Sequence, residues 1–157
     1  MSNMINPFKS VGKIVTGEDF IGRESALEEL RTRVLNVPLA NAAIVGLPRI
    51  GKSSLMKQAF IEIADSLWDK ERIVAVWYSF VDYNDDAIDG RPEDVYLDIL
   101  QEIVRSLKMR GFTNEYVNEY ARRAAKPEIR FQQLSSEIKG FFDELTIFNK
   151  VGVIICI

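Results

Sequence analysis

The chain has no histidine and only one cysteine among its 157 residues. The lack of histidine excludes a Ser-His-Asp triad, a Cys-His pair and any metal site built on imidazole. The single cysteine excludes a disulfide framework. Because Cys156 lies within an apolar run, we expect a buried thiol there.

The sequence also lacks targeting and membrane signals. The first residues, Met-Ser-Asn-Met-Ile-Asn-Pro, have neither the basic region nor the apolar core of a signal peptide. No apolar run approaches the length of a membrane span. We therefore expect a cytoplasmic protein without a membrane partner.

Charge gives little support for nucleic acid as a partner. The net charge is −3, from 20 basic and 23 acidic residues, whereas a broad nucleic-acid surface needs a basic excess. A local basic patch remains an alternative to a solvated helical face, the favoured interpretation. The cations concerned fall in one half of the chain: Arg105, Lys108, Arg110, Arg122, Arg123, Lys126 and Arg130.

Residues 46–53 read Gly-Leu-Pro-Arg-Ile-Gly-Lys-Ser, which matches the phosphate-binding loop pattern G-x-x-x-x-G-K-[ST]. The glycines let the backbone approach a polyphosphate and turn its N–H groups inward. Lys52 is expected to reach the β- and γ-phosphates, and the Ser53 hydroxyl to ligate Mg²⁺. Lys52 and Ser53 are thus the candidate catalytic residues, and Ser53 is the candidate metal ligand. The residues expected to surround the phosphates are Gly46, Leu47, Pro48, Arg49, Ile50, Gly51, Lys52, Ser53 and Ser54.

The neighbourhood of this loop favours a true site over a chance match. Residues 42–45 form a short apolar run suited to a buried strand, and residues 53–67 show the periodicity of an amphipathic helix. The helix N-terminus would add partial positive charge to the phosphate site. Two loop residues carry open interpretations. Pro48 removes one N–H donor, and Arg49 either contacts phosphate or is a solvated loop residue.

Strands alternate with helices along the rest of the chain. We expect a lead over 1–17, and a partial P-loop ATPase domain over 18–157. Helical spacing predicts helices at 25–36, 93–109, 113–125 and 128–145, and apolar β-branched runs predict strands at 73–81 and 151–157, with an acidic loop at 82–92. This alternation predicts an α/β fold, a parallel sheet covered by helices on both faces, with ligands at the carboxyl ends of its strands.

A second motif, Phe20-Ile21-Gly22-Arg23-Glu24, lies about 25 residues upstream of the loop and is followed by a helix. Together the two motifs resemble the AAA+-related P-loop ATPases of the STAND and origin-recognition type, most strongly over residues 6–60. The resemblance implies a three-layer P-loop NTPase fold of AAA+ type that binds ATP or ADP with Mg²⁺. It also implies that Phe20, Ile21 and Gly22 line the adenine pocket, with Arg23 near it. The alternative is that Phe20 and Ile21 only fasten the first helix to the core.

The sequence departs from this family at its third strand. In the family that strand ends in an acidic pair, the Walker B motif, whereas here the chain stops after the apolar run 151–157. Asp82 and the pair Asp85-Asp86 stand in the wrong places to substitute. We therefore expect a fragment with a sheet incomplete at its C-terminus. It would bind nucleotide but hydrolyse it very slowly, with ATP hydrolysis left to the full-length parent.

Three functional hypotheses follow. The favoured one is an ATP- or ADP-binding switch module of a STAND-type signalling or defence ATPase, with a homo-oligomer or other domains of the parent chain as partners. The second is a DNA-associated ATPase of the origin-recognition or helicase-loading type. The third is an interaction or structural fragment without nucleotide turnover.

Overall fold

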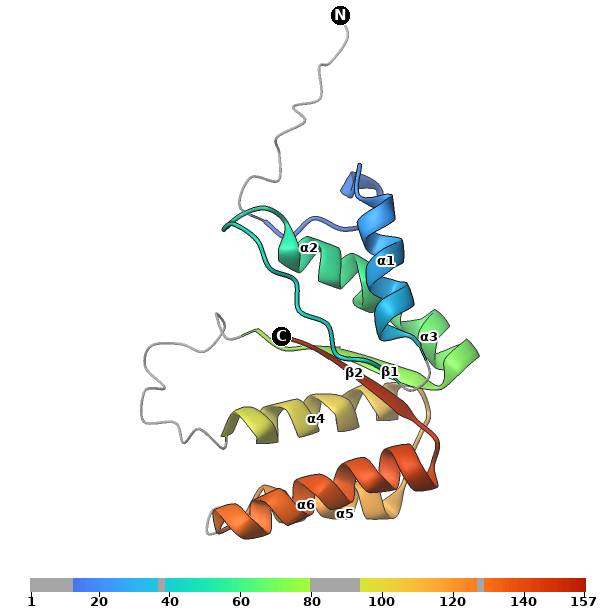
Figure 1. Cartoon of the computed structure of the whole chain (residues 1–157). Helices are drawn as coiled ribbons and strands as arrows, with labels where there is room; N and C mark the ends of the chain where they lie inside the picture. Colours follow the sequence, from blue (N-terminus) through green and yellow to red (C-terminus); the bar gives the residue numbers. More distant parts are fainter. Residues whose placement is uncertain (1–12, 37–38, 80–93, 127–128) are drawn as a thin grey trace, which may run out of the picture. The chain divides into compact units, whose positions relative to one another are not determined.

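The computed structural model describes residues 13–36, 39–79, 94–126 and 129–157 (Figure 1). Contacts within the chain divide it into two compact units, Met1–Ile63 and Ala64–Ile157. The phosphate-loop pattern belongs to the first unit, and both observed strands belong to the second. The two units are therefore described separately.

The first unit is built from short helices. A 3₁₀-helix (η1, Gly17–Asp19) is followed by α1 (Glu24–Val34), then by α2 (Lys52–Met56) and a π-helix (η2, Lys57–Ile61) that continues α2 without a break. Helix α1 contacts η2. Among the residues of this unit that the structure describes, few apolar side chains are buried: Leu30, Val34, Leu55, Ala59 and Phe60. Because this core is small, the polar contacts of the unit are expected to contribute to its stability beside the apolar ones.

The second unit combines helices with a small parallel sheet. It contains α3 (Ala64–Glu71), β1 (Ile73–Trp77), α4 (Asp94–Met109), α5 (Glu115–Ala124), α6 (Phe131–Asp143), a π-helix (η5, Glu144–Phe148) and β2 (Gly152–Cys156). Strands β1 and β2 pair in parallel, from Ile73 opposite Gly152 to Trp77 opposite Cys156. Helix α4 packs on β1, and α5 packs on both α4 and α6.

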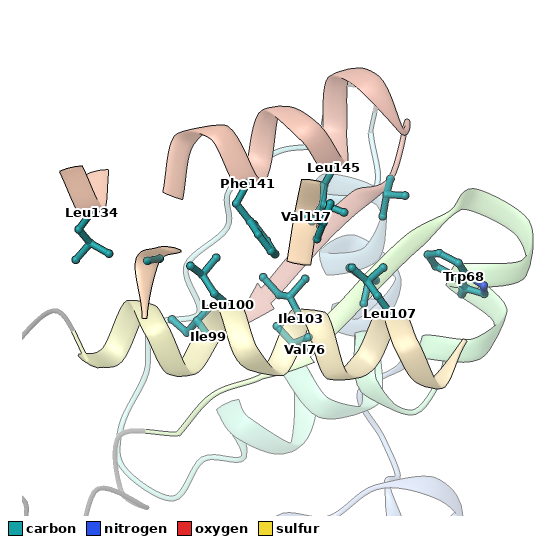
Figure 2. Packing of buried hydrophobic residues seen from close by; sticks show 13 residues of the cluster. Trp68, Val76, Ile99, Leu100, Ile103, Leu107, Val117, Leu134, Phe141 and Leu145 are labelled. Atoms are coloured by element: carbon teal, nitrogen blue, oxygen red, sulfur yellow. The ribbon is translucent and has the colours of Figure 1, made fainter. Parts of the chain in front are cut away.

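Helix α4 lies at the centre of the core of this unit. Its buried residues Ile99, Ile103 and Leu107 recur every four positions, which places them on one face of the helix. Figure 2 shows Ile103 between Val76 of β1 and Phe141 of α6. Ile103 and Phe141 are both fully buried, so they join the helices to the sheet.

The predicted buried thiol is confirmed. Cys156 on β2 is 2% exposed and free. Burial raises the pKa of its thiol to about 11, because the thiolate would lose its hydration. The thiol therefore stays protonated near neutral pH.

The helices predicted at 25–36, 93–109, 113–125 and 128–145 are confirmed to within a few residues. The region predicted as one helix over 53–67 instead contains α2, the π-helix η2 and α3, with a turn at 62–63. The predicted strands at 73–81 and 151–157 correspond to β1 and β2, and their parallel pairing agrees with the predicted sheet type. Most of the lead, the acidic loop 82–92 and the C-terminal part of the 73–81 strand lie outside the described residues.

The predicted three-layer P-loop NTPase sheet of AAA+ type is wrong. Within the described ranges the sheet has two strands, and residues 42–45, predicted as the first strand, join no ladder. Val45 is 92% exposed. Two of these four residues are alanines, which have low β-propensity and bury little apolar area. Apolar character over four residues was therefore too weak a basis for a central strand.

Most members of the basic cluster pair with carboxylates. Arg105 contacts Glu102, Arg122 contacts Glu119, and Arg123 contacts both Glu119 and Glu137. Arg110, whose side chain is 13% exposed, reaches Asp65 at 2.9 Å. These pairs favour the interpretation of a solvated helical face over that of a nucleic-acid patch.

No helix among the described residues is both long enough and apolar enough to cross a bilayer.

Packing between α5 and α6 yields a stability prediction at Gly140. A Cβ added there would lie 2.7 Å from Cζ and 2.9 Å from Cδ1 of the Tyr120 ring. Tyr120 packs against the core, and the Arg123 guanidinium lies 4.8 Å from its ring centre, so the ring has little freedom to move. We expect Gly140→Ala to lower the free energy of unfolding by about 1–3 kcal/mol through overpacking, as measured by urea denaturation.

Helix propensity alone predicts the opposite sign, a gain of about 1 kcal/mol. Ser136→Ala, at an exposed position one turn earlier in α6, is the matched control and should change stability little. A Gly140→Ala variant as stable as the wild type would show that Tyr120 does not constrain this packing.

Candidate functional site

The phosphate-loop pattern adopts a sharp turn in which two residues have left-handed backbone conformations. Gly51 has φ of 86° and forms the N-cap of α2, while Arg49 has φ of 62°. Glycine adopts this conformation without steric cost, whereas an arginine does so with strain. The Ile50 amide donates to the Leu47 carbonyl at 3.4 Å, which closes the turn. The loop is therefore compact.

Lys52 bends back over the loop that precedes it. Its Nζ donates to the carbonyls of Gly46 at 3.0 Å and Leu47 at 2.9 Å. The ammonium group is thus held at the loop, and its exposed position leaves it accessible to an anion. A Cβ at Gly46 would lie 3.2 Å from the Ile50 side chain, so this position favours the smallest residue.

A cavity of about 560 Å³ opens beside the loop. One wall is the loop and the start of α2, from Arg49 to Ser54. The other comes from upstream residues: Lys13, Ile14, Val15, Asp19, Phe20, Ile21 and Arg23. Over the whole lining, four residues are cations (Lys13, Arg23, Arg49 and Lys52) and one, Asp19, is a carboxylate. This excess of positive charge favours an anionic ligand.

The upstream motif contributes both apolar surface and charge. Phe20 is half-buried, and Ile21 is 81% exposed, so apolar surface is available at the pocket. The Arg23 guanidinium lies over the loop, with Nη1 3.7 Å from the place where a Cβ on Gly51 would stand. Arg23 therefore lies beside the phosphate loop itself, where a guanidinium can reach a bound phosphate.

Arg31 supports the helix that carries the loop. In the π-helix η2 the Glu62 amide bonds to the Lys57 carbonyl at 3.0 Å, so the usual register of helical hydrogen bonds is broken. The Arg31 side chain donates to the carbonyls of Gln58 at 2.9 Å and Ala59 at 3.0 Å. Partial burial lowers the pKa of Arg31, but a guanidinium keeps its charge at any ordinary pH.

The structure brings together most of the residues predicted for the site. Those that line the cavity are Phe20, Ile21, Arg23, Arg49, Ile50, Gly51, Lys52, Ser53 and Ser54. Gly22, Gly46, Leu47 and Pro48 do not line it, although the carbonyls of Gly46 and Leu47 hold Lys52. The sequence predicted no role for Lys13, Ile14, Val15 or Asp19, because no residue pattern indicates that they line one cavity with the loop.

Oxygen donors for a magnesium ion are few. Of the cavity-lining residues, Asp19 carries the single carboxylate, and Ser53 is an exposed serine at the start of α2. Among the described residues no cluster of three or more acidic or cysteine side chains could hold a metal alone. These residues fit Mg²⁺ as an ion that keeps several waters and arrives with a polyphosphate.

Comparisons with protein-family models, with curated proteins and with solved structures found no match to this chain. The functional argument therefore depends on the residues and their geometry.

The contacts of Arg31 yield a prediction about the scaffold of the site. Arg31→Ala should leave the Gln58 and Ala59 carbonyls without their side-chain donor and lower the free energy of unfolding by about 1–3 kcal/mol. Arg33→Ala is the matched control, because Arg33 lies on the same helix in an exposed ion pair with Glu29. That substitution should cost well under 1 kcal/mol. Equal losses in the two variants, measured by urea denaturation, would contradict the role given to Arg31.

Proposed function

We propose that the chain binds ATP or ADP, with the polyphosphate held at residues 46–53. The observation that carries this proposal is a cavity whose lining combines loop residues Arg49 to Ser54, Lys52 among them, with further cations. A loop of this sequence offers backbone N–H groups, lysine and hydroxyl to phosphate oxygens. Arg23 and Arg49 add guanidinium groups at the same cavity. A guanidinium suits phosphate because its planar donors can bind two oxygens of one phosphate.

Lys52 is the residue on which the affinity should depend most. Its ammonium already lies within hydrogen-bond distance of two loop carbonyls. A bound phosphate would offer a charged acceptor in addition to those neutral carbonyls, and charge-assisted hydrogen bonds are about twice as strong as neutral ones. The loop therefore needs little rearrangement to accept the ligand, which reduces the cost of binding.

The nucleoside would lie against the upstream motif. Phe20 and Ile21 supply apolar surface at the cavity, and a flat base binds to such surface without any catalytic group. The preference for adenine over guanine comes from the resemblance of Phe20-Ile21-Gly22-Arg23-Glu24 to the STAND and origin-recognition ATPases.

On this basis we propose a nucleotide-dependent switch of STAND type as the broader role. A ligand that binds the folded first unit stabilises it by mass action, and such a gain can bias the contacts of the chain with partners. The proposal stops at binding. Phosphoryl transfer also requires a group that orients the attacking water, and no described residue is assigned that task.

Removal of the lysine charge tests the phosphate site. We expect Lys52→Ala to raise the dissociation constants of ADP and ATP roughly 10- to 100-fold, the loss of one charged hydrogen-bonding group. Isothermal titration calorimetry in the presence of Mg²⁺ is the measurement. Lys70→Ala, on the exposed side of α3, is the control and should bind as the wild type does. An unchanged dissociation constant for Lys52→Ala would remove the basis of the proposal.

Removal of the Phe20 ring tests the position of the base. Phe20→Ala should weaken ADP roughly 5- to 100-fold, the range of base–aromatic contacts, and leave inorganic tripolyphosphate unaffected. The control is Phe148→Ala, which removes a phenyl ring that is 72% exposed in the other unit. If the affinities for ADP and tripolyphosphate fell by the same factor, the role of Phe20 would be to stabilise the fold and not to bind the base.

A further inference from the structure

Residues 13–17, here called the upstream segment, are attached to the helix that follows the phosphate loop. The Val15 amide donates to Ser54 Oγ at 2.9 Å, and the Gly17 amide donates to Gln58 Oε1 at 2.7 Å. These bonds join residues about 40 positions apart in the sequence. Both anchors lie in the first unit, where Figure 1 shows the upstream segment (blue) beside the start of α2.

The two bonds match the repeats of an extended chain and a helix. Val15 and Gly17 are two residues apart, and Thr16 between them is extended, with φ of −142° and ψ of 174°. Alternate amides of an extended chain point the same way and recur about every 6.6 Å. Side chains four residues apart on a helix, such as Ser54 and Gln58, recur about every 6 Å on one face. One face of the helix therefore binds successive inward-facing amides of the upstream segment.

The attached segment contributes to the lining of the cavity. Lys13, Ile14 and Val15 line it together with the loop residues, as do Asp19, Phe20 and Ile21. Ser54 is 9% exposed, and its oxygen already accepts the Val15 amide. The sequence predicts a contact between Ser54 and phosphate, which stays a prediction, and the structure shows a contact between Ser54 and the upstream segment.

We propose that Ser54 and Gln58 are positioning residues for the nucleoside. They fix the upstream segment, which in turn places Phe20 and Ile21 against the base, while the phosphates are bound by the loop. This inference rests on the proposed nucleotide site and adds that different residues of one helix act on the phosphates and on the base. Ser53 serves the phosphate and metal, and its neighbour Ser54 serves the base.

The test compares two ligands on paired variants. Calorimetry with Mg²⁺ measures ADP and inorganic tripolyphosphate on wild type, Ser54→Ala and Gln58→Leu. Each variant removes one neutral hydrogen bond, so ADP should weaken about 3- to 10-fold while tripolyphosphate binds unchanged. Gln58→Glu retains an acceptor oxygen and should restore most of the ADP affinity. Ser53→Ala is the matched control and should weaken both ligands when Mg²⁺ is present.

The outcomes separate this inference from the proposed function. Failure of wild-type protein to bind either ligand would overturn the proposed function itself. If wild type binds both, an equal loss of ADP and tripolyphosphate in Ser54→Ala would make Ser54 a phosphate ligand and refute the inference. Unchanged ADP affinity in both variants would refute it as well. Far-UV circular dichroism checks the fold, and Gln58→Leu carries the test if Ser54→Ala does not fold.

Discussion

The candidate site depends on the single helical stretch from Lys52 to Ile61. Its first turn carries the phosphate loop, and its side binds the upstream segment through Ser54 and Gln58. Carbonyls in its π-helical part accept hydrogen bonds from the Arg31 guanidinium. Because few of the described apolar residues of this unit are buried, these polar contacts contribute to its stability. A change in the helix would therefore alter both walls of the cavity together.

Electrostatics give this arrangement its preference among ligands. The chain as a whole carries a net charge of −3, yet the cavity concentrates cations from the loop and the upstream segment. A local excess of one charge in a concave site attracts the opposite charge more strongly than the net charge would suggest. The carboxylate of Asp19 opposes this excess only in part. A polyphosphate satisfies such a site better than a neutral ligand of equal size would.

Local patterns predicted most of the helices well, because helices depend on residues close in the sequence. The period of Ile99, Ile103 and Leu107 was enough to place α4, and the loop pattern led to the residues that line the cavity. The pairing of strands was harder to predict from the sequence. The apolar run at 42–45 was read as a central strand, but whether a strand forms depends on a partner that the run itself does not specify.

The remaining parts of the site also arise from contacts distant in sequence. Nothing in the lead marks Lys13 as a cavity residue, because its place is set by the bond from Val15 to Ser54. The π-helix is likewise contacted by Arg31, which lies 27 residues before Gln58. Such contacts couple segments whose individual sequences look ordinary, so they became visible only in the folded chain.

The central claim is that the backbone amides around Gly51 bind the phosphates. Amide nitrogen–proton correlation spectra of the labelled chain, recorded during titration with Mg²⁺ and tripolyphosphate, test it most directly. The account predicts the largest, saturable shifts at Gly51, Lys52 and Ser53, and negligible shifts at core amides of the second unit such as Ile103. Shifts confined to other residues, or none at millimolar ligand, would contradict it.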